Sequence, residues 1–101
     1  MILCGIDLET TGVEPHKSEI TEIGYAIFDT ENWDKPLVME SQMCKIAGTV
    51  PAEIVELTGI TDDILKRSGI AIDEVLGKLH ANLDRFGVEY MVAHNGTFDK
   101  D

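Results

Sequence analysis

One stretch near the start, Ile6-Asp7-Leu8-Glu9-Thr10-Thr11-Gly12, constrains the rest of the chain more than any other. The apolar run before it and the glycine that ends it predict a buried β-strand followed by a turn. Because successive side chains of a strand point to opposite faces, Asp7 and Glu9 share one face. Two carboxylates on one face repel each other unless a cation lies between them, and oxygen ligands suit Mg²⁺ or Mn²⁺. Taken alone, the pair favours the simpler interpretation of an acidic strand end beside a solvated turn.

The chain length bounds the number of domains. The sequence has 101 residues, 44% of them hydrophobic, which predicts a single domain over residues 1–101 with a modest core. No stretch is long and apolar enough to span a membrane, and the start lacks the features of a signal peptide, so we expect a cytoplasmic protein. Cys4 and Cys44 lie in apolar runs and are interpreted as buried free thiols.

The charge balance limits how this chain could bind a polyanion. Eight basic and nineteen acidic residues give a formal net charge of −11, which argues against a broad basic surface for nucleic-acid phosphates. It leaves open an enzyme that holds a few phosphates through bound metal ions, because a bound cation reverses the local electrostatics.

Two further strands follow the acidic stretch. The segment Ile20–Phe28 is apolar on both faces, which is typical of an inner strand. The segment Val38–Ile46 is more polar, which suits the edge of a sheet. Because the connections are too short for helical crossovers, the three strands are predicted to form an antiparallel meander.

The second half of the chain alternates helices with one strand. Ala52–Thr58 is predicted as a helix bounded by a proline and a glycine, and a short helix capped by Thr61 follows it. The clearest helical periodicity lies in Ala71–Phe86. Tyr90–His94 is then a short apolar strand, which a helical crossover can bring back parallel to the first strand.

This topology predicts that acidic residues from two strand ends meet. The carboxyl ends of parallel neighbouring strands lie at one edge of the sheet, where ligands of α/β sheets gather. Asp7, Glu9 and Asp99 would then face one site. Three carboxylates without a thiolate indicate one or two divalent metals, and a metal pair can hydrolyse a phosphodiester by in-line displacement.

Three segments together resemble a known family, the DEDD 3′–5′ exonucleases of the DnaQ-like proofreading group. The acidic stretch followed by Glu22-Ile23-Gly24 is similar to the first motif of that family. Leu57-Thr58-Gly59-Ile60-Thr61-Asp62 is similar to the segment after its third strand, and Ala93-His94-Asn95-Gly96-Thr97-Phe98-Asp99 to its second motif. The resemblance covers nearly the whole chain. It implies an α/β ribonuclease H-like fold, with an antiparallel three-strand meander and then a parallel strand after a crossover helix, incomplete at the C-terminus.

The resemblance also implies roles for individual residues. Asp7, Glu9 and Asp99 would be the catalytic carboxylates that bind two Mg²⁺ or Mn²⁺ ions. The residues implied to contact the substrate are Thr10, Leu57, Thr58, Asn95 and Phe98. The implied partners are the 3′ end of single-stranded DNA or RNA and a polymerase.

One family feature is missing from the sequence. The family has a third motif, with a fourth aspartate and a His or Tyr that orients the attacking water, and the sequence reaches Asp101 without it. His16 and His94 are poor substitutes, the first in a polar loop and the second at a strand end. We therefore expect residues 1–101 to be the N-terminal portion of an exonuclease domain, with little or no nuclease activity alone.

Three functions remain open at this point. The leading interpretation is a metal-dependent 3′–5′ exonuclease that hydrolyses phosphodiester bonds at the 3′ end of DNA or RNA. The alternative is a non-catalytic nucleic-acid-binding or assembly module with the same fold, and a third is a plain α/β domain with an acidic edge. The sequence does not separate DNA from RNA, or proofreading from repair or RNA processing.

Overall fold

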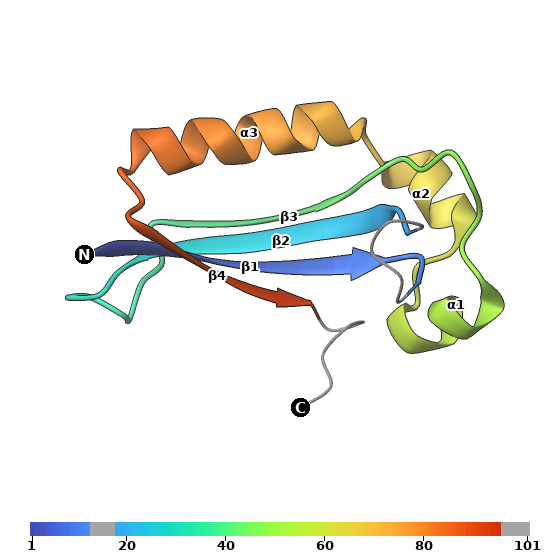
Figure 1. Cartoon of the computed structure of the whole chain (residues 1–101), viewed down its shortest axis with the longest axis horizontal. Coiled ribbons are helices and arrows are strands. Elements are labelled where there is room, and N and C mark those ends of the chain that lie inside the picture. Colours follow the sequence, from blue (N-terminus) through green and yellow to red (C-terminus); the bar gives the residue numbers. More distant parts are fainter. Residues whose placement is uncertain (13–17, 96–101) are drawn as a thin grey trace.

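A four-stranded mixed sheet organises the chain, with one helix along one of its faces and two shorter helices at one end (Figure 1). The computed structural model describes residues 1–12 and 18–95. Within this part the elements are β1 (Ile2–Thr10), β2 (Ile20–Asp29), β3 (Val38–Met43), α1 (Ala52–Thr58), α2 (Asp62–Ser68), α3 (Ile72–Arg85) and β4 (Tyr90–Asn95).

The sheet has the predicted topology. Its strand order is β3-β2-β1-β4, with β1 antiparallel to β2, β2 antiparallel to β3, and β4 parallel to β1. The inner position of β2, the edge position of β3 and the helical crossover before β4 are all confirmed. The mixed sheet with its crossover helix is the predicted ribonuclease H-like arrangement.

The third strand is shorter than predicted. It ends at Met43 instead of Ile46, and Cys44 forms an isolated bridge with Ile70 in the linker between α2 and α3. The backbone N–H of Cys44 still donates to Thr21 O at 2.8 Å, while Lys45 N donates to Ile70 O at 2.9 Å. The chain therefore leaves β2 at this point to pair with the linker, which the polarity pattern did not indicate.

Helix α3 covers one face of the sheet (Figure 1) and builds the main core with it. Its buried members are Cys4, Ile23, Tyr25, Ile27, Cys44, Val75 and Leu79. Asn82 Nδ2 donates a 2.8 Å hydrogen bond to the hydroxyl of Tyr25, which satisfies the polar end of a buried aromatic side chain. Both cysteines are free and fully buried, as predicted.

Helices α1 and α2 enclose a second, smaller core, formed by Val50, Ile54, Ile60 and Leu65. Helix α1 has the predicted bounds and ends at Gly59, whose φ of 75° is a left-handed conformation that favours glycine. Thr61 Oγ1 accepts from Ile64 N at 3.2 Å, so the predicted N-cap of α2 is confirmed. No helix in residues 1–12 and 18–95 is both long and apolar enough to cross a membrane.

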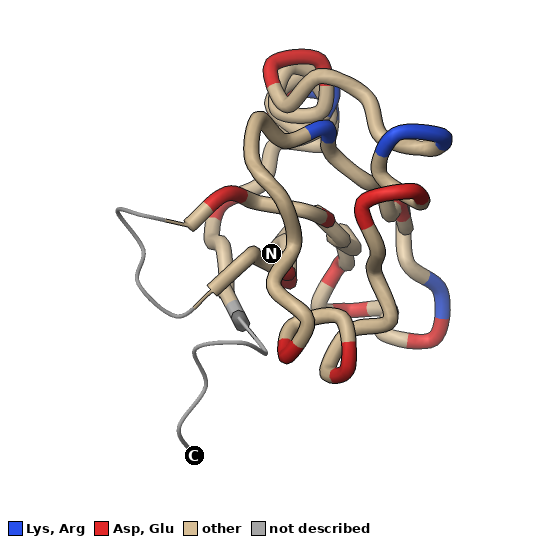
Figure 2. The backbone as a smooth tube through the Cα atoms, turned by 90° about the vertical axis from the view of Figure 1, so that its right-hand side faces the viewer, with Lys and Arg blue, Asp and Glu red and all other residues tan. Residues whose placement is uncertain are grey.

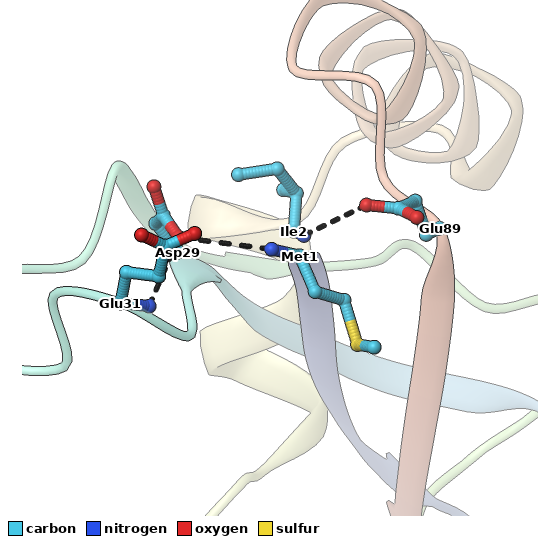
Figure 3. Close-up of polar contacts among 5 residues, drawn as sticks. All are labelled: Met1, Ile2, Asp29, Glu31 and Glu89. Atoms are coloured by element: carbon cyan, nitrogen blue, oxygen red, sulfur yellow. Dashed lines mark hydrogen bonds and ion pairs between the residues drawn. The ribbon is translucent and has the colours of Figure 1, made fainter.

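The amino end of β1 is fastened on both sides (Figure 3). The terminal ammonium of Met1 lies 3.9 Å from Asp29 Oδ1, and Ile2 N donates to Glu89 Oε1 at 3.3 Å. Glu89 N donates in return to Ile2 O at 2.8 Å. These contacts join the amino end of β1 to both of its neighbours, β2 and β4.

Candidate active site at the carboxyl end of the first strand

Asp7 and Glu9 lie on the face of β1 that is turned away from α3. Their neighbour Cys4 is fully buried in the core under α3, whereas Asp7 is exposed and Glu9 half-buried, as strand alternation requires. The strand runs from Ile2 to Thr10, so both carboxylates belong to one strand. The prediction that they share a face is confirmed.

The pairing of β1 with β4 defines the edge of the sheet to which these carboxylates belong. Asp7 is opposite His94 and Leu8 is opposite Asn95 in the parallel register. The two strands therefore end at the same edge, as predicted. Asp99 and Phe98 lie outside the residues that the structure describes, as does the side chain of Asn95.

The structure adds a carboxylate that sequence reasoning did not assign to this site. Glu22 of β2 is directly opposite Glu9 in the antiparallel register, so the two belong to the same face. Its Oε2 accepts a 2.7 Å hydrogen bond from Ser41 Oγ. Only the strand register shows that the two residues are neighbours, because twelve residues separate them in sequence.

The donor chemistry of this face suits a hard cation, because Asp7 and Glu9 offer carboxylate oxygens only. Among the described residues, no group of three or more His, Cys, Asp or Glu side chains is gathered closely enough to hold a metal ion. A complete ion site would therefore need a ligand from outside the described residues.

The other residues expected to contact substrate differ in availability. The hydroxyl of buried Thr10 donates to Gly12 O at 2.6 Å, beside a register shift between Glu9 and Thr10, so it shapes the turn after β1. The Thr58 hydroxyl donates to Ile54 O at 2.9 Å and closes the end of α1. Leu57, in contrast, is 76% exposed and free to contact a ligand.

A shallow hollow of about 460 Å³ lies beside Asp7 on the same face. Small residues of the two central strands form its floor, and larger side chains of the flanking strands form its rim: Gly5, Gly24, Ala26, Met39 and Val92. A Cβ atom built on Gly5 would meet nothing within 4 Å, so the floor at this residue is open. A second hollow, between residues 45–49 and α2, contains no residue of β1.

The charge distribution agrees with the sequence. Seen from the end where β1 stops, acidic positions are spread over the molecule and basic ones are few (Figure 2). Two of the described basic residues are already paired, Arg67 with Asp63 at 2.9 Å and Lys78 with Glu40 at 2.9 Å. Because the chain has nineteen acidic and eight basic residues, a nucleic acid would meet a net negative charge unless metal ions offset it.

Comparison with known proteins assigns the family. A profile of the exonuclease family matches residues 4–100. This chain belongs to the exonuclease family. The predicted resemblance to DnaQ-like proofreading exonucleases is thereby confirmed at the level of the family.

Two curated relatives of this exonuclease-family chain are bacterial polymerases. The DNA polymerase III PolC-type of Thermotoga petrophila is 34% identical over 95 residues, which cover 93% of this chain and 6% of the relative. The PolC-type polymerase of Halalkalibacterium halodurans is 48% identical over 46 residues, or 46% of this chain and 3% of the relative. The chain therefore spans only a small part of these proteins.

Solved structures share the fold of this family member. Exonuclease I from Methylocaldum szegediense matches with a TM-score of 0.73 and 23% identity, over 93% of this chain and 20% of that chain. E. coli exonuclease I in complex with a dT13 oligonucleotide matches with a TM-score of 0.73 and 21% identity, over 93% and 20% of the two chains. A 3′-exonuclease described as recognising a histone mRNA stem-loop has a TM-score of 0.74 and 23% identity, over 91% and 45%. At these identities the likeness establishes the fold alone.

Proposed function

We propose that this chain carries the metal-binding and strand-binding part of a 3′–5′ exonuclease, with Asp7, Glu9 and Asp99 as its catalytic carboxylates. The observation that supports this most is the parallel pairing of β1 with β4, which ends both strands at one edge. Asp99 follows Asn95 by four residues, and four residues of chain reach at most about 14 Å. That reach is sufficient to bring the third carboxylate to the first two.

In this proposal the side chains of the protein hold the metal ions and orient the nucleic-acid strand. One or two Mg²⁺ or Mn²⁺ ions would supply Lewis-acid stabilisation of the phosphodiester and activation of water. Asp7 and Glu9 hold the ions from the exposed face of β1. Leu57 packs its exposed side chain on the terminal nucleoside. Thr10, Thr58, Asn95 and Phe98 shape the pocket around that nucleoside.

The proposed partners are the 3′ end of a single-stranded nucleic acid and a polymerase. An oligonucleotide complex of a protein with the same fold supports the first, and the PolC-type relatives support the second. Both DNA and RNA remain candidate substrates. The proteins with this fold include one solved in complex with a dT13 oligonucleotide and one described as recognising a histone mRNA stem-loop.

We further propose that residues 1–101 work as part of a larger catalytic unit. The family's third motif, with its aspartate and its His or Tyr, is not in the sequence. We therefore expect the 101-residue chain alone to bind metal and strand but to hydrolyse little. Hydrolysis of a 3′-ended single strand by the purified chain with Mn²⁺, lost in Asp7→Ala, would contradict this part of the proposal.

Metal binding tests the proposal most directly. A ligand that binds only the native state raises its stability, so Mn²⁺ is expected to raise the Tm of the chain. At a concentration about 100 times Kd, the stabilisation would be about 2.7 kcal/mol. Asp7→Asn should abolish the rise, measured by differential scanning calorimetry.

The matched control is Asp34→Asn, which removes the same charge from an exposed turn between β2 and β3. It should keep the full rise in Tm. The non-catalytic alternative, with a decayed metal site, predicts no rise for any of the three proteins.

A further inference from the structure

Glu19 forms an unusually complete set of contacts just before β2. Its Oε2 accepts from Ala47 N at 2.8 Å, and its Oε1 accepts from Gly48 N at 2.9 Å. Its backbone is fastened to Thr11, whose N–H donates to Glu19 O at 2.9 Å and whose Oγ1 accepts from Glu19 N at 3.0 Å. One residue thus binds two loops that are far apart in sequence.

The first of these loops continues β1 directly. Thr11 follows the strand that carries Asp7 and Glu9, so the backbone bonds of Glu19 hold the turn at the acidic end. The second loop, around residues 47–48, leads into α1, on which Leu57 is exposed. Glu19 therefore joins the acidic strand end, through its backbone, to the loop before α1, through its side chain.

Helix α1 packs in a core separate from the main one, so contacts such as these help to join it to the sheet. The buried residues of α1 and α2 belong to the second core, whose members do not include those under α3. On the other side of the same loop, Asp62 Oδ1 accepts from Val50 N at 2.8 Å. The loop is thus held between a carboxylate next to the sheet and a carboxylate of α2.

We propose that Glu19 is a positioning residue, which sets the place of α1 and its exposed Leu57 relative to the carboxylates of β1. Glu19 itself lies in neither the metal-binding nor the substrate-contacting set. Its two charge-assisted hydrogen bonds to successive backbone N–H groups fix both the distance and the orientation of the loop. The consequence for substrate binding rests on the proposed function, whereas the positioning of α1 does not.

The first test measures position without any substrate. Spin labels on cysteines introduced at Lys35 and Glu56, both exposed, report the distance between the β2–β3 turn and α1 by pulsed electron paramagnetic resonance. The native Cys4 and Cys44 are 0% exposed and should stay unlabelled. We expect Glu19→Gln to shift or broaden the distance distribution, since an amide offers one acceptor oxygen in place of two.

A second variant perturbs the same contact without changing any charge. A Cβ atom at Gly48 would lie 3.2 Å from Glu19 Oε1, so the carboxylate would have to move by a few tenths of an ångström and its hydrogen bonds to the loop would be strained. Gly48→Ala should therefore reproduce the shift while keeping every donor and acceptor. It also keeps the test decisive if Glu19→Gln destabilises the fold.

The second test measures whether Glu19→Gln strengthens or weakens binding of an oligonucleotide, because loss of charge and loss of positioning predict opposite changes in Kd. Removing a negative charge should strengthen binding of a polyanion, so a charge effect alone predicts that Glu19→Gln binds a 3′-ended single-stranded oligonucleotide more tightly. Loss of positioning predicts the opposite, a Kd raised about tenfold, the scale of one lost charge-assisted hydrogen bond. Glu56→Gln, the same charge change on α1, should not weaken binding.

These outcomes separate the two proposals. Wild-type distance distributions in both Glu19→Gln and Gly48→Ala would overturn the positioning role. Unchanged or tighter oligonucleotide binding by both variants would overturn its consequence for the substrate. If the wild-type chain with Mn²⁺ does not bind the oligonucleotide, the proposed function fails, while the distance measurement still decides whether Glu19 positions α1.

Discussion

The residues of β1 show how the alternation of side chains along a strand places apolar and acidic residues on opposite faces of the sheet. Alternation sends Cys4 into the core under α3 and presents Asp7 on the opposite face. Glu22 joins that face from the neighbouring strand because it is in register with Glu9. The carboxylates are thereby concentrated on one side, where a bound cation would offset their mutual repulsion.

The buried thiols give this protein a predicted response to alkaline pH. Burial raises the pKa of the Cys4 thiol, and burial together with the charge of Glu22 raises the pKa of the Cys44 thiol, both from an ordinary 9.0. Since the folded state holds these protons more tightly than the unfolded state, the stability they contribute is complete below pH 9.0 and declines as pH rises above it. Urea unfolding between pH 8 and 10.5 should show this decline.

The double variant Cys4→Ala/Cys44→Ala isolates the thiol contribution to that decline. It should be less stable at neutral pH, because buried sulfur atoms are lost, but its stability should depend less on pH above 9.0. An equally steep decline in the double variant would assign the effect to other groups.

At the scale of elements, the linker between α2 and α3 decides where β3 ends. Gly69 lies against the backbone of both α2 and the segment after β3, and a Cβ atom there would lie 2.5 Å from Leu65 O and 3.0 Å from Cys44 C. Both neighbours are backbone atoms, which cannot rotate away as a side chain would. The absence of a side chain at this residue therefore permits the bridge between Cys44 and Ile70.

Gly69→Ala is expected to destabilise the chain by about 2 kcal/mol, the typical cost of forcing extra volume into a packed site. Gly77→Ala is the matched control in α3, where an added Cβ atom meets nothing within 4 Å. That change should stabilise the chain by about 1 kcal/mol through helix propensity. Chemical denaturation measures the change in the free energy of unfolding, which should have opposite signs in the two variants. A Gly69→Ala variant as stable as the wild type would contradict the steric argument.

At the scale of the whole molecule, the two faces of the sheet differ. One is covered by α3, whereas the other carries apolar residues of β3 and β4 that are largely exposed: Met39 at 69%, Tyr90 at 60% and Val92 at 60%. β4 is also the last strand of the sheet, with no partner beyond it among the described residues. Apolar surface beside an unpaired strand edge favours association with other chains.

The 101-residue chain is therefore expected to self-associate in a concentration-dependent manner. Sedimentation velocity should show larger species at high protein concentration, and Val92→Lys should reduce them because it places a charge on the exposed face. Leu76→Lys is the control, since Leu76 is 44% exposed on α3, on the other side of the sheet. Equal reduction by both variants would indicate an effect of net charge instead of a specific surface.

Much of the fold and part of the site follow from local sequence patterns. The strand and helix assignments, the inner place of β2 and the parallel return of β4 were predictable because periodicity, caps and loop lengths are local properties. The acidic pair on β1 was predictable for the same reason, since two residues of one strand share a face whatever surrounds them. The early end of β3 was not, because the competing partner, Ile70, lies far along the chain.

The sequence by itself determined the order of the elements, the shared face of Asp7 and Glu9, and the family. Only the tertiary structure decided that Glu22 opposes Glu9, and that the carboxylate of Glu19 holds the loop before α1. The physical reason is that pairing register and side-chain hydrogen bonds join residues separated by long stretches of chain. No periodicity along a single segment encodes which partner, among many of the same kind, each of these residues will meet.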